Sequence, residues 1–406
     1  MAQTFEYKVR DREGRVIQGS LDAENHDLVV NKLRQMGYTP INVERQEVSA
    51  LKKELKIPGL GSRVGLKDVA VFSRQFATMI NSGLTLLRAM NILAEQTENP
   101  ALAKILTQVR LDIERGSSLS QALARHPKAF NRLYIAMVRA GEIGGMLDSV
   151  LLQLASTIEK QVELRRKIIS AMTYPVAVLA LVLLIVTAML IFVVPTFESL
   201  YADLDSPLPG PTKLLLAVSS FMTTFAPVII LAEVGMVVLF KRWIASEKGR
   251  AIWDSFKLKV PVFGKLVRKT ALTRFARTLS SLLRAGVPIL EALEITSETV
   301  GNAVVAKAVR EVQVAVRQGE PMARPLAQHA VFPPMVVQML AVGEETGAVD
   351  TMLDKVADFY DQEIEALVDA LTSLLEPLLI VVLGGVVGGM VIALYMPMFN
   401  IINVIQ

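Results

Sequence analysis

The sequence predicts a mainly α-helical, polytopic membrane protein with two homologous cytoplasmic six-helix bundles, three transmembrane helices and a small N-terminal ββαβ module. Three observations predict this class. Charge-free runs follow two helical regions, residue identities recur along the chain at a nearly constant offset, and the first 45 residues alternate apolar and polar side chains as short strands do.

The charge-free runs predict the membrane helices. The 30 residues Ile168–Phe197 carry no charge and follow the basic cluster 165–167, and Pro377–Gln406 is also free of charge. A third apolar run, Leu214–Phe240, contains one charge, Glu233. About 20 mainly apolar residues suffice to cross the hydrocarbon layer of a bilayer. We therefore expect transmembrane helices over residues 172–195, 214–240 and 376–398.

The distribution of basic residues predicts the orientation of these helices. Nine Lys and Arg residues against two acidic ones occur from Lys241 to Lys269, whereas the loop before the second run has only Lys213. The positive-inside rule then places that loop outside and both flanking regions in the cytoplasm. The N-terminus has no signal-peptide pattern, so we expect it to be cytoplasmic.

Changes in residue pattern, together with glycine and proline positions, predict the domain boundaries. Phe5, Tyr7 and Val9 alternate with polar residues, Gly37 follows a helical pattern, and Tyr174-Pro175 is expected to kink or restart a long helix near the membrane surface. The expected order is an N-terminal cytoplasmic module (1–45), a linker (46–65), a first cytoplasmic helical domain (66–171), a first membrane helix (172–195), an external loop (196–213), a second membrane helix (214–240), a second cytoplasmic helical domain (241–375), a third membrane helix (376–398) and an external tail (399–406).

The second helical domain repeats the first. Residues recur 203 positions later and, after a one-residue deletion, 202 positions later. The pairs include Phe72 and Phe275, Arg74 and Arg277, Gly83 and Gly286, Asn99 and Asn302, Phe130 and Phe332, Pro175 and Pro377, and Pro195 and Pro397. Two equivalent domains on one side of a membrane require an even number of crossings between them, which agrees with the two predicted spans.

Composition excludes several classes of function. The chain has no cysteine, so it has no thiolate metal site and no cysteine nucleophile. It contains no phosphate-binding loop and no His-Glu-x-x-His motif, and we interpret its histidines, His26, His126 and His329, as turn or surface residues. The net charge of +4 comes with basic clusters beside the apolar runs, which favours a membrane surface over nucleic acid as the partner.

A Gly-Glu pattern occurs once in each repeat. Its members are Gly141, Glu142, Gly145 and Asp148 in the first repeat, and Gly343, Glu344, Gly347 and Asp350 in the second. The favoured interpretation is structural: the glycines permit a tight interhelical turn, the Glu accepts from nearby backbone N–H groups, and the Asp starts the next helix. The alternative is that Glu142 and Asp148 bind a cation through oxygen ligands or contact a partner.

Two features lie inside the predicted membrane helices. Glu233 is an ionisable group in an apolar run, and we interpret it as a protonated packing or hydrogen-bonding residue in preference to a proton relay. Gly384 and Gly388 form a Gly-x-x-x-Gly pattern in the third span. Small residues at this spacing allow close helix approach, so the pattern predicts helix packing or a homo-oligomer.

The entry to the first span carries a family resemblance. Lys167, Ala171, Tyr174 and Pro175, with Pro195 twenty positions further on, resemble the signature of the inner-membrane platform proteins of type II secretion and type IV pilus assembly, the GspF and PilC family. The second repeat contributes Glu376, Pro377 and Pro397, and it departs from the signature because Glu376 stands where the first repeat has Tyr174.

The resemblance implies a scaffold of the inner membrane without catalysis or a required cofactor. Its implied partners are a cytoplasmic hexameric assembly ATPase, a retraction ATPase in a pilus system, pilin or pseudopilin subunits, other inner-membrane assembly proteins and lipid, with no nucleic acid. It also leaves open a divalent cation, calcium, in the first domain at Glu142 and Asp148.

Two branches of the family remain open. The segments that start at Phe72 and at Gly83 favour the pilus branch over the platform of a secretion system. A transporter or channel subunit is a more remote alternative, because the three spans together contain a single charge.

Overall fold

The computed structural model describes residues 3–10, 16–23, 26–45, 63–196, 210–261 and 263–404. Most of the predicted linker and of the predicted external loop lies outside the described residues. The chain divides into two compact units, Met1–Arg63 and Val64–Gln406, and each is described by itself.

The first unit contains a three-stranded antiparallel sheet and one helix. Its elements are β1 (Gln3–Arg10), β2 (Val16–Ala23), α1 (His26–Gln35) and β3 (Thr39–Arg45), with the strand order β2-β1-β3. Gly37 adopts a positive φ of 83° and ends α1, as its position after the helical pattern predicts. Val9, Val29 and Leu33 form a small fully buried core between sheet and helix.

The first repeat of the second unit is entirely helical in its described residues. It comprises α2 (Leu66–Asn81), α3 (Leu86–Gln96), α4 (Pro100–Glu114), α5 (Leu119–Ala124), α6 (Arg132–Gly144) and the start of α7 (Leu147–Ala188). The Asn99 side chain accepts from the N–H groups of Ala101 and Leu102, and Pro100 occupies the first turn of α4. The Asn99-Pro100 dipeptide therefore starts α4.

The second repeat has the same order of helices. It comprises α11 (Phe263–Arg284), α12 (Ile289–Thr299), α13 (Ala303–Arg317), α14 (Ala323–Ala327), α15 (Pro334–Thr346) and the start of α16 (Val349–Val404). Phe72 and Phe130 pack with ring centroids 5.7 Å apart, and their repeat mates Phe275 and Phe332 pack at 5.1 Å. Both repeats contribute to one continuous hydrophobic core.

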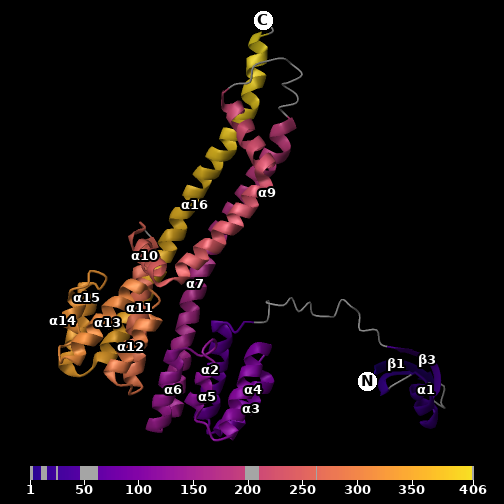
Figure 1. Ribbon diagram of the computed structural model, residues 1–406, viewed down its shortest axis with the longest axis vertical. Helices are drawn as coiled ribbons and strands as arrows, with labels where there is room; N and C mark the ends of the chain where they lie inside the picture. Colours follow the sequence, from indigo (N-terminus) through magenta and orange to yellow (C-terminus); the bar gives the residue numbers. More distant parts are fainter. Residues whose placement is uncertain are drawn as a thin grey trace. The chain divides into compact units, whose positions relative to one another are not determined.

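Three helices in the described residues are long and apolar enough to cross a membrane. They are α7, which continues through the π-helical turn η2 (Met189–Val193), α9 (Gly210–Ala245) and α16. These long rods extend away from the helical bundles (Figure 1). A further helix, α10 (Glu247–Lys259), joins α9 to the second repeat.

We expected a kink or a restart at Tyr174-Pro175, and the restart does not occur: helix α7 runs without a break for 42 residues with Pro175 inside it. A proline removes one helical hydrogen bond, but membrane helices tolerate this loss because neighbouring groups and local adjustments of the helix can satisfy the freed carbonyl. Two other ends differ from the expectation. Helix α9 begins at Gly210, inside the predicted loop, and α16 continues to Val404, inside the predicted tail.

Candidate functional site

The Gly-Glu pattern forms the turn between the last short helix of each repeat and the long helix that follows it. Gly145 and Gly347 adopt φ values of 65° and 70°, and each ends its helix in the left-handed conformation. The next N–H, of Met146 or Ala348, donates back to the carbonyl of Gly141 or Gly343 at 3.0 and 2.9 Å. The predicted tight turn is therefore present in both copies.

The first glycine of each pattern allows two helices to touch. A Cβ added to Gly141 would lie 3.1 Å from the Val150 Cβ and 3.2 Å from the Leu147 Cα. At Gly343 it would lie 2.9 Å from the Val349 Cα, which is backbone and cannot rotate away. A side chain at either position would push the long helix off the preceding helix, so both glycines set the angle at which the long helix leaves the bundle.

The glutamate joins this turn to a third helix. The Glu142 carboxylate accepts from the backbone N–H groups of Leu119 and Ser120, the latter at 3.1 Å. Glu344 accepts in the same way from Met322 and Ala323, at 2.5 and 3.0 Å. From the sequence we expected the carboxylate to accept from N–H groups close to it in the chain. In the structure, the donors instead lie 21 to 23 residues earlier, at or next to the first residue of a short helix.

The two aspartates have different surroundings. Asp148 is exposed in the first turn of α7, and Asp350 lies 3.4 Å from the Arg284 Nε in the first turn of α16. Both Glu142 oxygens already accept backbone hydrogen bonds. In the part of the chain that the structure describes, no group of three or more His, Asp or Glu side chains could hold a metal ion.

A buried arginine connects α11 to the long helix α16, and the sequence analysis did not single it out as a site. Arg277 on α11 is 5% exposed and contacts three carboxylates of α16, those of Asp354 at 2.9 Å, Asp358 at 3.0 Å and Asp361 at 2.6 Å. Lys160 on α7 reaches Asp358 at 3.0 Å. In the first repeat, the matching positions form one pair, Arg74 with Glu159. The sequence signal that could have identified this site is the recurrence of a charged residue, Arg74 and Arg277, among mainly apolar repeat positions.

Several ion pairs join the two repeats, and in all of them the positive charge comes from the same repeat. The basic partner belongs to the first repeat and the acidic partner to the second in each of these pairs: Arg132 with Glu294 and Glu298, Arg139 with Glu291, Lys160 with Asp358, and Lys167 with Glu365. Lys167 of the family signature also contacts Glu163 within α7 at 3.2 Å. It thus stands where α7 and α16 meet, immediately before the charge-free run.

Pro195 of the signature explains an irregularity in the first span. The Val194 N–H donates to the Met189 carbonyl, five residues back, which is the π-helical pattern of η2. In that register the Leu190 carbonyl would accept from residue 195, but proline has no N–H. The Ser219 hydroxyl of α9 donates to this carbonyl instead.

Pro397 likewise leaves a backbone carbonyl of the third span without its helical N–H donor. In an α-helix the Ala393 carbonyl accepts from residue 397, and here that residue is also proline. The Thr212 hydroxyl of α9 donates to the Ala393 carbonyl at 2.6 Å. Two hydroxyls on one helix therefore satisfy the two carbonyls that the repeated prolines leave free, and no sequence motif pointed to Thr212 or Ser219.

The remaining predicted residues occupy less connected positions. Ala171 packs against the apolar cluster of α16, Pro175 is buried, and Tyr174, Glu376 and Pro377 are exposed. Glu233 is exposed on α9. A Cβ added to Gly384 or Gly388 would meet no atom within 4 Å, so these glycines do not pack against the described part of the chain.

Fold and site together define a polytopic membrane protein with a duplicated helical domain. The family model for the type II secretion system (T2SS) protein F matches residues 72–195 and 275–397, and the model for the N-terminal domain of that protein matches residues 1–44. The chain belongs to this family, and the resemblance that the sequence suggested is confirmed, as are the internal repeat and the mainly α-helical membrane class.

Similarity to curated proteins covers the whole chain. It is 46% identical to the type IV pilus assembly protein PilC of Thermus thermophilus, over 99% of both chains. It is 42% identical to the protein of the same name from Myxococcus xanthus, over 99% of this chain and 96% of that one. Identity to the type II secretion system protein F of Vibrio cholerae is 32%, over 99% of both.

Proposed function

We propose that the protein is the inner-membrane platform of a type IV pilus machine. It couples a cytoplasmic hexameric assembly ATPase to the extraction of pilin subunits from the membrane and to their polymerisation into a filament. The 46% identity to a pilus assembly protein over the full chain supports the pilus branch. The equivalent platform of a secretion system is the second candidate, supported by the 32% identity to a secretion protein.

The structural observation that carries the proposal is the continuity of two helices. Helices α7 and α16 each begin at a Gly-Glu turn within a helical bundle and continue without interruption into an apolar span. A movement imposed on a bundle can therefore reach its span directly. The α7–α16 contact and the ion pairs across it join the two helices, so the spans would move together.

The proposal includes a topology. The N-terminal ββαβ module and the two six-helix bundles lie in the cytoplasm, within the boundaries expected for them, and the C-terminal tail lies outside. Supporting this orientation, nine basic residues follow α9's apolar run, from Lys241 to Lys269. Further partners in this proposal are a retraction ATPase, other inner-membrane assembly proteins and additional copies of the chain. The protein itself performs no catalysis.

A bound cation is not part of the proposal. Both oxygens of Glu142 accept backbone hydrogen bonds, and a calcium site needs six to eight oxygen ligands. Glu142 thus acts as a structural connection between α6 and α5.

A deletion strain tests the proposed function. We expect loss of surface pili with pilins still present in the inner membrane, and no ATP hydrolysis by the purified protein. Pili on the deletion strain would contradict the proposal. Loss of an exported enzyme with normal pili would select the secretion platform, as would neighbouring reading frames for secretion components in place of pilins and a retraction ATPase.

A further inference from the structure

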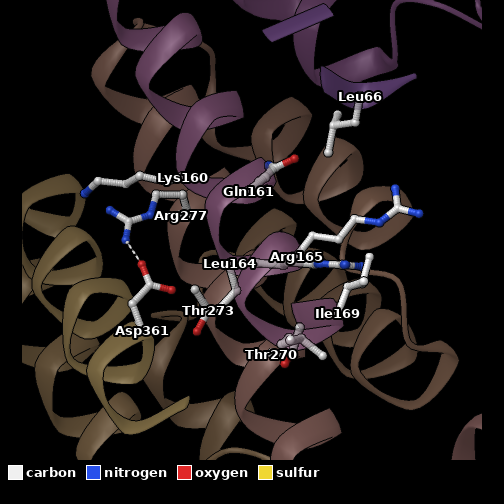
Figure 2. A pocket seen from close by; sticks show the side chains of 12 residues that line it. Leu66, Lys160, Gln161, Leu164, Arg165, Ile169, Thr270, Thr273, Arg277 and Asp361 are labelled. Carbon is white, nitrogen blue, oxygen red and sulfur yellow. Dashed lines mark hydrogen bonds and ion pairs between the residues drawn. The ribbon is translucent and has the colours of Figure 1, made fainter. Parts of the chain in front are cut away.

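A cavity of about 400 Å³ opens between the two repeats where α7 enters its apolar run. Its walls come from α7, α11 and α16, with Leu66 of α2 at the edge (Figure 2). One side is apolar, formed by Leu164, Ile168 and Ile169. The other side is strongly basic.

Four basic side chains line this cavity, and two of them lack a counterion in the part of the chain that the structure describes. Arg277 and Lys160 are paired with carboxylates of α16, including the Asp361 carboxylate that also lines the wall (Figure 2). By contrast, Arg165 and Arg274 form no ion pair within the described residues. Burial lowers the pKa of the Arg274 guanidinium, and the positive charge of Arg165 lowers it further. An anion between the two would relieve their repulsion.

A buried hydroxyl on the same wall also lacks a hydrogen-bond partner among the residues described. Thr273 is 4% exposed and lines the cavity (Figure 2). Its Oγ1 is the one buried side-chain oxygen or nitrogen in the described residues without a hydrogen-bond partner. A buried hydroxyl without a hydrogen-bond partner destabilises the protein, so a group that accepts its hydrogen bond would gain from binding here.

The position of the cavity along α7 indicates which kind of ligand carries this hydrogen-bond acceptor. Ile168 is the first residue of the charge-free run, so the cavity stands where the span begins and where headgroups lie beside a membrane protein. Exposed apolar side chains continue from Ile169 along α7, with Val176 and Leu179 among them. We infer that this cavity binds an anionic phospholipid, whose phosphate contacts Arg165, Arg274 and Thr273 while its acyl chains lie along α7.

Lipid titration of the full-length protein tests the inference. Native mass spectrometry of the protein in neutral detergent would count bound phosphatidylglycerol, with phosphatidylcholine of the same acyl chains as the comparison. We expect one tightly bound phosphatidylglycerol per chain and weaker binding of phosphatidylcholine. Each of Arg165→Gln and Arg274→Gln should weaken phosphatidylglycerol binding about fivefold, the contribution expected of one basic residue near an anionic surface.

Two further variants separate this site from general membrane attraction. Arg166→Gln removes the same charge at the same depth from an exposed residue outside the cavity, and it should leave binding unchanged. Thr273→Val should weaken binding several-fold without lowering the thermal unfolding midpoint, because its hydroxyl has no hydrogen-bond partner among the described residues.

The inference fails if Arg166→Gln weakens binding as much as Arg165→Gln, or if phosphatidylcholine binds equally well. Inorganic phosphate provides the last arm of the test. If millimolar phosphate displaces the lipid and itself raises the unfolding midpoint to the same degree, the ligand is a free phosphate and the lipid assignment is overturned. This test does not depend on the proposed role in pilus assembly.

Discussion

Matched residues of the two repeats have the same identity and also the same conformation or contacts. Gly145 and Gly347 take the same left-handed conformation, and Glu142 and Glu344 accept from the same pair of N–H groups in their respective repeats. A carboxylate that receives two backbone hydrogen bonds ties three helices together at one point. The turn is thus a joint that holds the start of each long helix in place.

Replacing this carboxylate should loosen the joint. Glu344→Ala leaves the N–H groups of Met322 and Ala323 without their acceptor, and hydrogen bonds to a charged group contribute about 2 kcal/mol. Hydrogen exchange measured on the peptide that contains α14 should accelerate about 30-fold, which corresponds to that loss. Glu345→Ala, at the exposed next residue, is the matched control and should change exchange little. Equal acceleration in both variants would contradict the capping role.

At the level of elements, α9 links the first and third spans through two hydroxyls. Ser219 reaches the Leu190 carbonyl and Thr212 reaches the Ala393 carbonyl, each left free by a proline of the family signature. Without these donors the two carbonyls would be buried and unpaired inside the predicted membrane region, where an unpaired polar group is costly. The prolines and the hydroxyls therefore act together to position α9.

Ser219→Ala should weaken the packing of α9 by about 1 kcal/mol, the size measured for hydrogen bonds between membrane helices. Unfolding in mixed micelles, followed by the fluorescence of Trp243 and Trp253, would measure the change. Ser220→Ala is the control, because Ser220 is exposed and donates only within its own helix, to Ala217. An equal cost for both serines would show that the contact with Leu190 contributes nothing.

Across the whole molecule, the sequence predicted what depends on local pattern or on the repeat. Long apolar runs with at most one charge revealed the three apolar helices, and the recurring Phe72 and Phe275 revealed the duplication. The sequence did not predict contacts between segments that lie far apart in the chain. The partner of Glu142 lies on another helix, and Lys160 bridges to Asp358 although the repeat mate of Lys160 is Gln362. Such contacts depend on how the two repeats pack, which no local pattern records.

The continuity of α7 is the property on which the proposed coupling depends, and it can be changed without altering length or register. Glu163, Arg166 and Ser170 are exposed along α7 between bundle and span. Replacing all three by glycine weakens the helix by about 3 kcal/mol relative to the triple alanine variant, since glycine costs about 1 kcal/mol per position. Both variants lose the same side chains, so their difference reports helix rigidity alone.

In a deletion strain that carries each variant, the triple alanine protein should restore pili and the triple glycine protein should restore few or none. Immunoblots of membrane fractions would verify that both proteins accumulate equally. If a rigid α7 transmits movement from the Gly145 turn to the span, only the helix-weakening variant loses assembly. Equal piliation with both variants would show that a continuous α7 is dispensable. It would leave α16, the other helix that runs without a break from a bundle into a span, to carry the coupling.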